Sequence, residues 1–194
     1  MAASEAEDIA GADISDEDLV VRLASGDEQA YGLLVDRHLQ PAYRFANRML
    51  GRTADAEDAA QEAFLKLWQK AHQWQAARGS FRSWFYRLLY NGSVDLMRRR
   101  PPFDPELEED RAGDDDPSLN VMEGDRAKAV RMALSTLPER QRAALLLTYY
   151  EGLSNREAAA ALDVGVKGLE SLLVRARRTL ARDLLDKKDD LLEE

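Results

Sequence analysis

The sequence predicts an all-α protein with two small helical domains: a four-helix first domain and a helix-turn-helix second domain, joined by a flexible acidic linker. Apolar residues recur at helical spacing in two blocks, residues 15–100 and 126–185. Between them, residues 101–125 carry prolines, glycines and a run of acids, which argues against a stable element. Residues 1–14 and 186–194 are acidic ends that we expect to be disordered.

The charge pattern indicates two basic domains between acidic segments. The chain has 194 residues and a net charge of −9, yet residues 21–101 sum to +5 and residues 126–182 to +6. The first 20 residues sum to −7, residues 102–125 to −9 and residues 183–194 to −4. Basic blocks suit contact with nucleic-acid phosphates, and acidic segments weaken non-specific DNA binding by the whole chain.

Several protein classes are excluded by composition. The chain has no cysteine, so disulfides and thiolate metal sites are ruled out, and its two histidines, His38 and His72, fall in separate helical patterns. We find no phosphate loop, no paired nucleophile and no metal-ligand spacing, so neither an enzyme nor a cofactor is expected. No apolar run approaches the roughly 18 residues of a membrane span, and a signal peptide is lacking, so we expect a cytoplasmic protein.

In the first block, turn and capping residues divide the chain into four helices. We expect Pro41 to kink or break the second helix near Leu39, and Gly51 to end it. Residues 75–79 read as a loop. The residues expected to cap the four helices at their N-termini are Ser15, Asp27, Thr53 and Ser80.

The fourth helix combines aromatic residues with arginines. The apolar positions expected in the core are Phe81, Trp84, Phe85, Leu88 and Leu89. The positions expected on the other side are Arg82, Tyr86, Arg87, Tyr90, Asn91, Val94 and Arg98. Arginines that hold phosphates beside rings that accept unstacked bases are typical of single-stranded DNA binding, whereas the alternative is an amphipathic helix with a basic rim.

Residues 154–180 predict a helix-turn-helix. Ser154 and Glu157 form a capping box, and residues 163–165 read as the turn. The second helix carries an apolar stripe formed by Val166, Leu169, Leu172 and Leu173. A helix that packs on one face and is polar on the other can lie in a DNA major groove, although an ordinary helical hairpin has the same pattern.

Taken together, four segments resemble the extracytoplasmic-function class of bacterial RNA polymerase sigma factors. The resemblance covers about residues 16–185 and depends on these segments in order: DAEDAAQEAFLKLW (55–68), SFRSWFYRLLYNGSVDLMRRR (80–100), LPERQRAALLLTYYEGLSNREAAAALDV (137–164) and RARRTL (175–180). It implies a non-enzymatic specificity subunit that directs transcription initiation, often in stress responses. The implied partners are the β′ and β subunits of core RNA polymerase, promoter DNA and an anti-sigma protein.

The resemblance also implies three sets of site residues. Core polymerase would be bound by Asp55, Asp58, Gln61, Glu62 and Leu65. The −10 promoter element would be melted and held by Arg78, Ser80, Arg82, Tyr86, Tyr90, Asn91 and Arg98. The −35 element would be read by Arg156, Lys167, Gly168, Glu170, Ser171, Arg175 and Arg178.

Some alternatives stay open at this point. Glu170 and Leu172 occupy places where the family often has basic residues, so Glu170 either accepts a bond from a cytosine amino group or faces solvent. The acidic linker is either a plain solvated spacer or a polyanion that threads a basic channel of a partner. The whole chain could instead be a dimeric helix-turn-helix regulator, or a sigma mimic that sequesters an anti-sigma protein.

Overall fold

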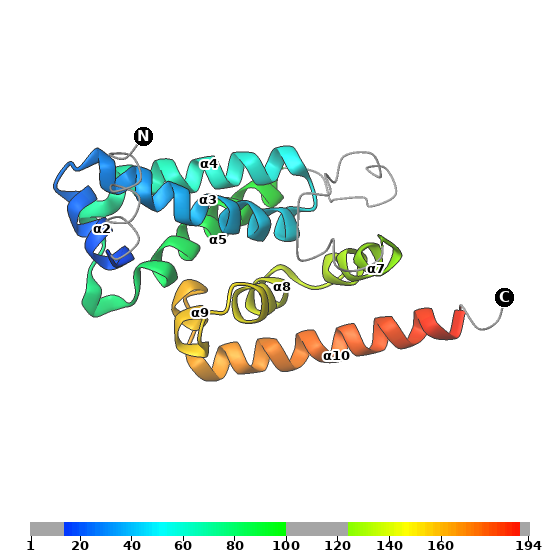
Figure 1. The fold of residues 1–194 in the computed structure, drawn as a ribbon. Coiled ribbons are helices and arrows are strands. Elements are labelled where there is room, and N and C mark those ends of the chain that lie inside the picture. The colour runs from blue at the N-terminus through cyan, green and yellow to red at the C-terminus, as the bar shows by residue number, and fades with distance from the viewer. Residues whose placement is uncertain (1–13, 100–123, 191–194) are drawn as a thin grey trace.

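The computed structural model describes residues 14–99 and 124–190, and every regular element in those two ranges is helical. The first domain comprises α2 (Asp16–Ala24), α3 (Glu28–Leu50), α4 (Thr53–Lys70), the short 3₁₀ turns η1 (Ala71–Gln73) and η2 (Ala76–Arg78), and α5 (Phe81–Arg99). The second comprises α7 (Gly124–Ser135), α8 (Glu139–Leu145), the π-helical turn η3 (Leu146–Tyr150), α9 (Asn155–Ala161) and α10 (Val166–Asp190). The two-domain all-α prediction is confirmed (Figure 1). The expectations for the acidic N-terminus and for most of the linker lie outside the described residues.

Most of the predicted helix boundaries in the first domain are confirmed by capping contacts. The Ser15 hydroxyl accepts from the Asp18 amide, and Asp27 accepts from the amides of Gln29 and Ala30. Gly51 ends α3 in the left-handed conformation, with φ of 73°. The Thr53 cap is wrong by one residue, because Arg52 is the N-cap and forms no side-chain capping bond.

The expected kink or break near Leu39 is not a break, because α3 runs without interruption from Glu28 to Leu50. Proline removes one backbone donor and crowds the preceding turn. Residues on both sides of Pro41 are nevertheless fully buried in the core of the domain, including Leu34, Ala42 and Phe45. We infer that this packing outweighs the local cost of the proline.

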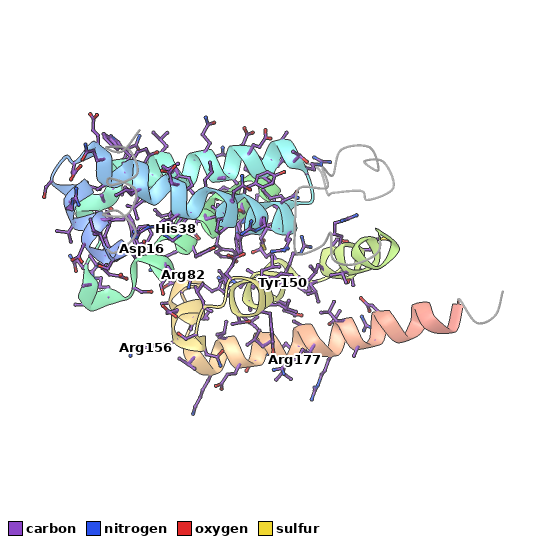
Figure 2. The ribbon with its side chains drawn as sticks, viewed as in Figure 1. Asp16, His38, Arg82, Tyr150, Arg156 and Arg177 are labelled. Carbon is purple, nitrogen blue, oxygen red and sulfur yellow. The ribbon has the colours of Figure 1, made fainter. Side chains whose placement is uncertain are left out.

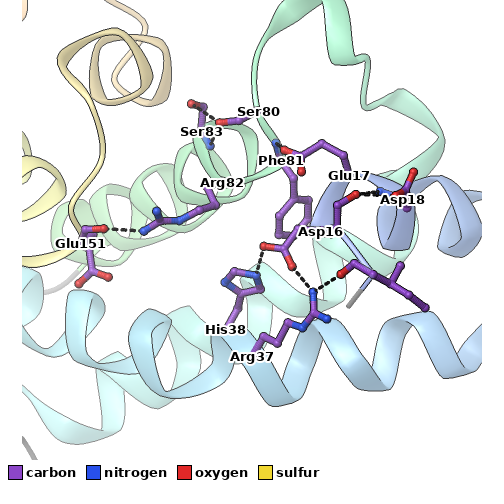
Figure 3. Close-up of polar contacts among 12 residues, drawn as sticks. Asp16, Glu17, Asp18, Arg37, His38, Ser80, Phe81, Arg82, Ser83 and Glu151 are labelled. Atoms are coloured by element: carbon purple, nitrogen blue, oxygen red, sulfur yellow. Dashed lines mark hydrogen bonds and ion pairs between the residues drawn. The ribbon is translucent and has the colours of Figure 1, made fainter. Parts of the chain in front are cut away.

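An ionic cluster ties α2 to α3 and fixes the start of α5. The Asp16 carboxylate lies 2.8 Å from the Arg37 guanidinium and 2.8 Å from the His38 imidazole (Figure 3). The neighbouring Glu17 carboxylate accepts from the backbone amide of Phe81 at 3.0 Å. In the first turn of α5, the Phe81 amide is therefore satisfied by α2, and the Ser83 amide is satisfied by the cap residue Ser80.

In the second domain, α8, η3, α9 and α10 enclose a core of leucines and alanines. Leu146, Leu147 and Leu162 are among its largest fully buried side chains. Helix α10 continues to Asp190, beyond the boundary at residue 185 expected from the sequence. The acidic segment contains neither glycine nor proline, so nothing in it stops the helix.

The two domains pack against each other in two layers. Helices α3, α4 and α5 form one layer, and α8, α9 and α10 lie beneath it, with α9 nearest to α5 (Figure 1). Among the residues that the structure describes, no helix is both long and apolar enough to cross a membrane.

Candidate nucleic-acid and polymerase interfaces

Local geometry builds the helix-turn-helix as the sequence predicts. The capping box is complete, since the Ser154 hydroxyl accepts from the Glu157 amide and the Glu157 carboxylate accepts from the Ser154 amide. Asp163 then adopts a left-handed conformation with φ of 55°, which turns the chain between α9 and α10. Leu169 and Leu173 on α10 are buried against the rest of the domain.

The opposite face of this motif is open to solvent. All seven residues expected to read the −35 element are exposed: Arg156, Lys167, Gly168, Glu170, Ser171, Arg175 and Arg178. The Ser171 hydroxyl donates within the helix to the Lys167 carbonyl at 2.9 Å. Arg156 points away from the first domain (Figure 2). A polar, basic helix face that is exposed to solvent is what insertion into a major groove requires.

Two exposed valines add apolar groups to the surface of α10. Val166 was expected in the buried stripe but is 42% exposed, because it is the first residue of the helix and no element covers it. Val174 is also 42% exposed and follows Glu170 by one helical turn on the outer face. Exposed methyl groups on a reading helix can contact thymine methyl groups. The predicted set omitted both residues, although the position of Val174 on the polar stripe marks it as a candidate.

The expected polymerase-binding residues border an open groove between α3 and α4. Asp58, Gln61, Glu62 and Leu65 line it from α4, opposite Tyr31, Val35, Leu39 and Tyr43 from α3. Leu65 is 53% exposed and Leu39 is 41% exposed, although both are large apolar residues. Apolar side chains next to acidic groups suit a partner helix that carries both leucines and arginines.

Asp55 does not share this groove. Its side chain faces inward from the first turn of α4 and is only 4% exposed. In this conformation Asp55 cannot reach a protein partner, so its position favours a structural role at the start of α4 rather than the expected contact.

Helix α5 is covered on two sides, not one. Phe81, Phe85 and Leu89 are buried in the first domain as predicted. Tyr86 and Tyr90, expected on the outer side, are buried as well. The Tyr86 ring packs edge-on against Phe45, and its hydroxyl is directed at the second domain.

The remaining −10 candidates fall into two groups. Arg78, Asn91 and Arg98 are exposed. Ser80 and Arg82 are partly buried because residues of the second domain contact them: the Ser80 hydroxyl donates to Glu157 at 2.9 Å, and Arg82 donates to the Glu151 carbonyl at 2.5 Å. Figure 2 shows Arg82 directed into the space between the two layers. The structure therefore does not bring the −10 candidates together on one open surface.

Electrostatics at this contact centre on Glu151. Burial raises the pKa of the Glu151 carboxyl, an effect partly offset by the hydrogen bond from Tyr86 and by the nearby Arg48, Arg44 and Arg82 guanidinium groups. Burial, together with the adjacent carboxylate, raises the pKa of Tyr86, so its hydroxyl stays protonated and able to donate.

Comparison with protein families matches both domains in the expected order. Residues 34–101 match the model of Sigma-70 region 2, and residues 127–180 match the model of Sigma-70 region 4. The second match includes the helix-turn-helix and most of α10.

Known proteins with similar sequences and structures agree with these matches. The chain is 34% identical over 172 residues to the ECF RNA polymerase sigma factor SigE of Mycolicibacterium smegmatis. This alignment covers 84% of this chain and 66% of SigE. It aligns with CnrH, solved in complex with the cytosolic domain of CnrY, at 31% identity and a TM-score of 0.67, over 89% of this chain and 97% of CnrH. The fold is also that of the sigma factor RpoE of Bartonella quintana, solved with the anti-sigma factor NepR, at 22% identity and a TM-score of 0.61, over 80% of this chain and 96% of RpoE. The chain belongs to the sigma-70 family of RNA polymerase sigma factors, in its extracytoplasmic-function class.

Proposed function

We propose that this sigma factor binds core RNA polymerase through the α3–α4 groove, reads −35 DNA with α10 and holds melted −10 DNA along α5. The observation that carries the proposal is the intact helix-turn-helix, whose outer face is basic and exposed, in a chain that matches Sigma-70 regions 2 and 4 in order. Its place of action would be the bacterial cytoplasm, where transcription takes place.

Residue roles follow from the chemistry of each surface. The residues that would contact the polymerase are Asp58, Gln61, Glu62 and Leu65. In the free chain the Glu62 carboxylate pairs with the Lys66 ammonium group at 2.8 Å, and an arginine of the partner would take the place of Lys66. On the second domain, the exposed set on α9 and α10 would divide into base-reading and phosphate-binding groups. Lys167, Gly168, Glu170 and Ser171 would face bases, while Arg156, Arg175 and Arg178 would bind phosphates. We add Val174 as a contact for a thymine methyl group.

An anti-sigma partner is part of the proposal. It is supported by the RpoE structure, which contains the anti-sigma factor NepR. The dimeric-regulator alternative is not favoured, because a regulator needs neither the α3–α4 groove nor the aromatic and arginine residues of α5.

The direct test is run-off transcription with purified core polymerase on a library of genomic fragments, with and without this protein. We expect new transcription starts that share one −35/−10 pair. Gln61→Ala with Leu65→Ala should abolish these starts by weakening polymerase binding, whereas Gln69→Ala, an exposed change elsewhere on α4, should leave them intact. Binding of the wild-type chain to core polymerase without any shared start would instead support the sequestering mimic.

A further inference from the structure

Glu151 is a buried carboxylate that the functions proposed above leave unexplained. It lies in the second domain, in the turn between η3 and α9, and its side chain is only 7% exposed. Its Oε2 accepts from the Tyr86 hydroxyl at 2.5 Å. Its carbonyl accepts from Arg82 (Figure 3). Buried charges are rare unless they are paired, so this arrangement is a specific contact rather than an incidental one.

An arginine of the first domain completes the surroundings of Glu151. The Arg48 guanidinium lies 3.9 Å from Glu151 Oε1, and it also stacks at 4.1 Å over the ring of Tyr150. In the other direction, Arg142 of α8 donates to the Met49 carbonyl at 2.6 Å. Each domain therefore places an arginine against the other, and both side chains are largely buried there.

Further contacts extend along α5 on both sides of Glu151. Ser80, at the start of α5, donates to Glu157 at 2.9 Å. Arg87, one turn beyond Ser83, pairs with Asp163 in the turn of the helix-turn-helix. The second domain thus presents three acidic residues to the stretch of α5 that carries the −10 candidates.

We propose that the second domain closes over α5 in the free protein, and that Glu151 competes directly with −10 promoter DNA for Arg82 and Tyr86. The inference rests on the proposed function of α5. Arg82 donates to the Glu151 carbonyl and Tyr86 donates to the Glu151 carboxylate, and a donor held there cannot bind a phosphate oxygen at the same time. Promoter DNA reaches the donors only when the domains separate, while the outer face of α10 stays available in either state.

The closed state can be measured without any assay of transcription. The chain has no cysteine, so two spin labels can be attached through Gln69→Cys on α4 and Ala181→Cys on α10. Both positions are exposed, and they lie on the two opposite layers of the molecule. Electron spin resonance then gives the distribution of distances between the layers in the free, full-length protein.

We expect one narrow distance population in the labelled wild-type chain. Glu151→Ala should raise the ratio of separated to closed molecules about tenfold, since a lost hydrogen bond to a charged group shifts an equilibrium by about this factor. Glu28→Gln removes one exposed carboxylate from α3 and should leave the distribution unchanged. An unchanged distribution for Glu151→Ala would overturn the proposal.

A second variant guards against loss of folding. Tyr86→Phe keeps the ring packed against Phe45 and Phe85 and removes only the hydroxyl that donates to Glu151. It should also widen the distance distribution, with a thermal transition close to that of the wild-type chain. A narrow distribution in this folded variant would contradict the proposed contact.

A transcription assay tests whether the closed state competes with −10 DNA, which the distance measurement alone does not test. At limiting core polymerase, Glu151→Ala should give several-fold more promoter-specific transcript than the wild-type chain, and Glu28→Gln should match the wild type. Equal transcript from Glu151→Ala and wild type would overturn the competition with −10 DNA. If neither chain produced specific starts, the proposed function would fail, and the competition would fail with it even where the distances show closure.

Discussion

Helices α5 and α10 are both expected to face DNA, yet their surroundings differ. On α10 all the candidate residues are exposed. On α5 the central candidates, Arg82, Tyr86 and Tyr90, are covered by the first or second domain. The proposed −35 surface is therefore formed in advance, whereas the proposed −10 surface would have to be uncovered. Duplex recognition can precede DNA melting in a protein built this way.

The largest effect should come from removing the support beneath α10. Leu169 is fully buried, so Leu169→Ala should lower the free energy of unfolding of the second domain by about 2–5 kcal/mol. All three tryptophans, Trp68, Trp74 and Trp84, lie in the first domain. Urea unfolding should show helix loss by circular dichroism at lower urea than the change in tryptophan fluorescence.

The matched control for that variant lies on the same helix. Val174→Ala removes two exposed methyl groups and should change stability by at most about 0.5 kcal/mol. If both variants shifted the dichroism transition equally, α10 would not be held by its buried stripe.

A smaller loss is expected from the cap that starts α9. Ser154→Ala removes the acceptor for the Glu157 amide and should cost about 1 kcal/mol of stability. Asn155→Ala, at the next exposed position, removes no capping contact in the structure and should cost far less. Equal costs would show that the capping box does not contribute to the stability of the motif.

The next prediction compares arginines on the two helices. Arg175→Ala should weaken binding to any duplex DNA and reduce the slope of log affinity against log salt by about 1, as expected for one lost phosphate contact. Arg82→Ala should leave this slope unchanged, because its guanidinium is held at the Glu151 carbonyl. A larger decrease for Arg82→Ala would mean that α5 is open in the free chain.

The smallest effect concerns the cluster that anchors α5 through α2. Burial raises the pKa of Asp16, but hydrogen bonds and charges from His38 and Arg37 outweigh it and hold that pKa below its ordinary value of 3.8. A carboxyl whose pKa is lower in the folded than in the unfolded protein stabilises the fold at pH values above its ordinary pKa. This stabilisation is lost as the pH falls through the pKa of the folded state. Asp16→Asn should therefore be less stable than wild type above about pH 5, with the difference shrinking toward pH 2.

Chemical unfolding at a series of pH values checks this dependence. Asp95→Asn, an exposed change on α5, should follow the wild-type curve at every pH. A difference for Asp16→Asn that grew with acidity would contradict the direction of the pKa shift.

Local signals in the sequence predicted local structure well. The capping box at Ser154, the left-handed Gly51 and the exposed face of α10 all follow from residues within one or two turns of each other. Pro41 was misjudged because packing from distant helices keeps α3 intact. The burial of Asp55 could not be predicted, because an acid early in a helix gives the same sequence pattern whether it faces solvent or the core.

The cover over α5 could not be predicted from periodicity. Tyr86 and Tyr90 fall on the face opposite Phe81 and Phe85. Part of the cover over this face comes from the second domain, about 65 residues further along the chain from Tyr86. Helical spacing reports that a face is amphipathic, but not which distant segment packs on it.

The central claim is that −10 promoter DNA cannot use Arg82 and Tyr86 while the second domain is closed over α5. The most direct measurement is the distance between labels at Gln69→Cys and Ala181→Cys while core polymerase and promoter DNA are titrated together into the full-length protein. We predict that the narrow distance of the free chain disappears in proportion to formation of the promoter complex and that a longer distance replaces it. If the promoter complex formed and kept the free-chain distance, closure would not withhold the −10 surface, and the contrast between α5 and α10 would have no functional meaning.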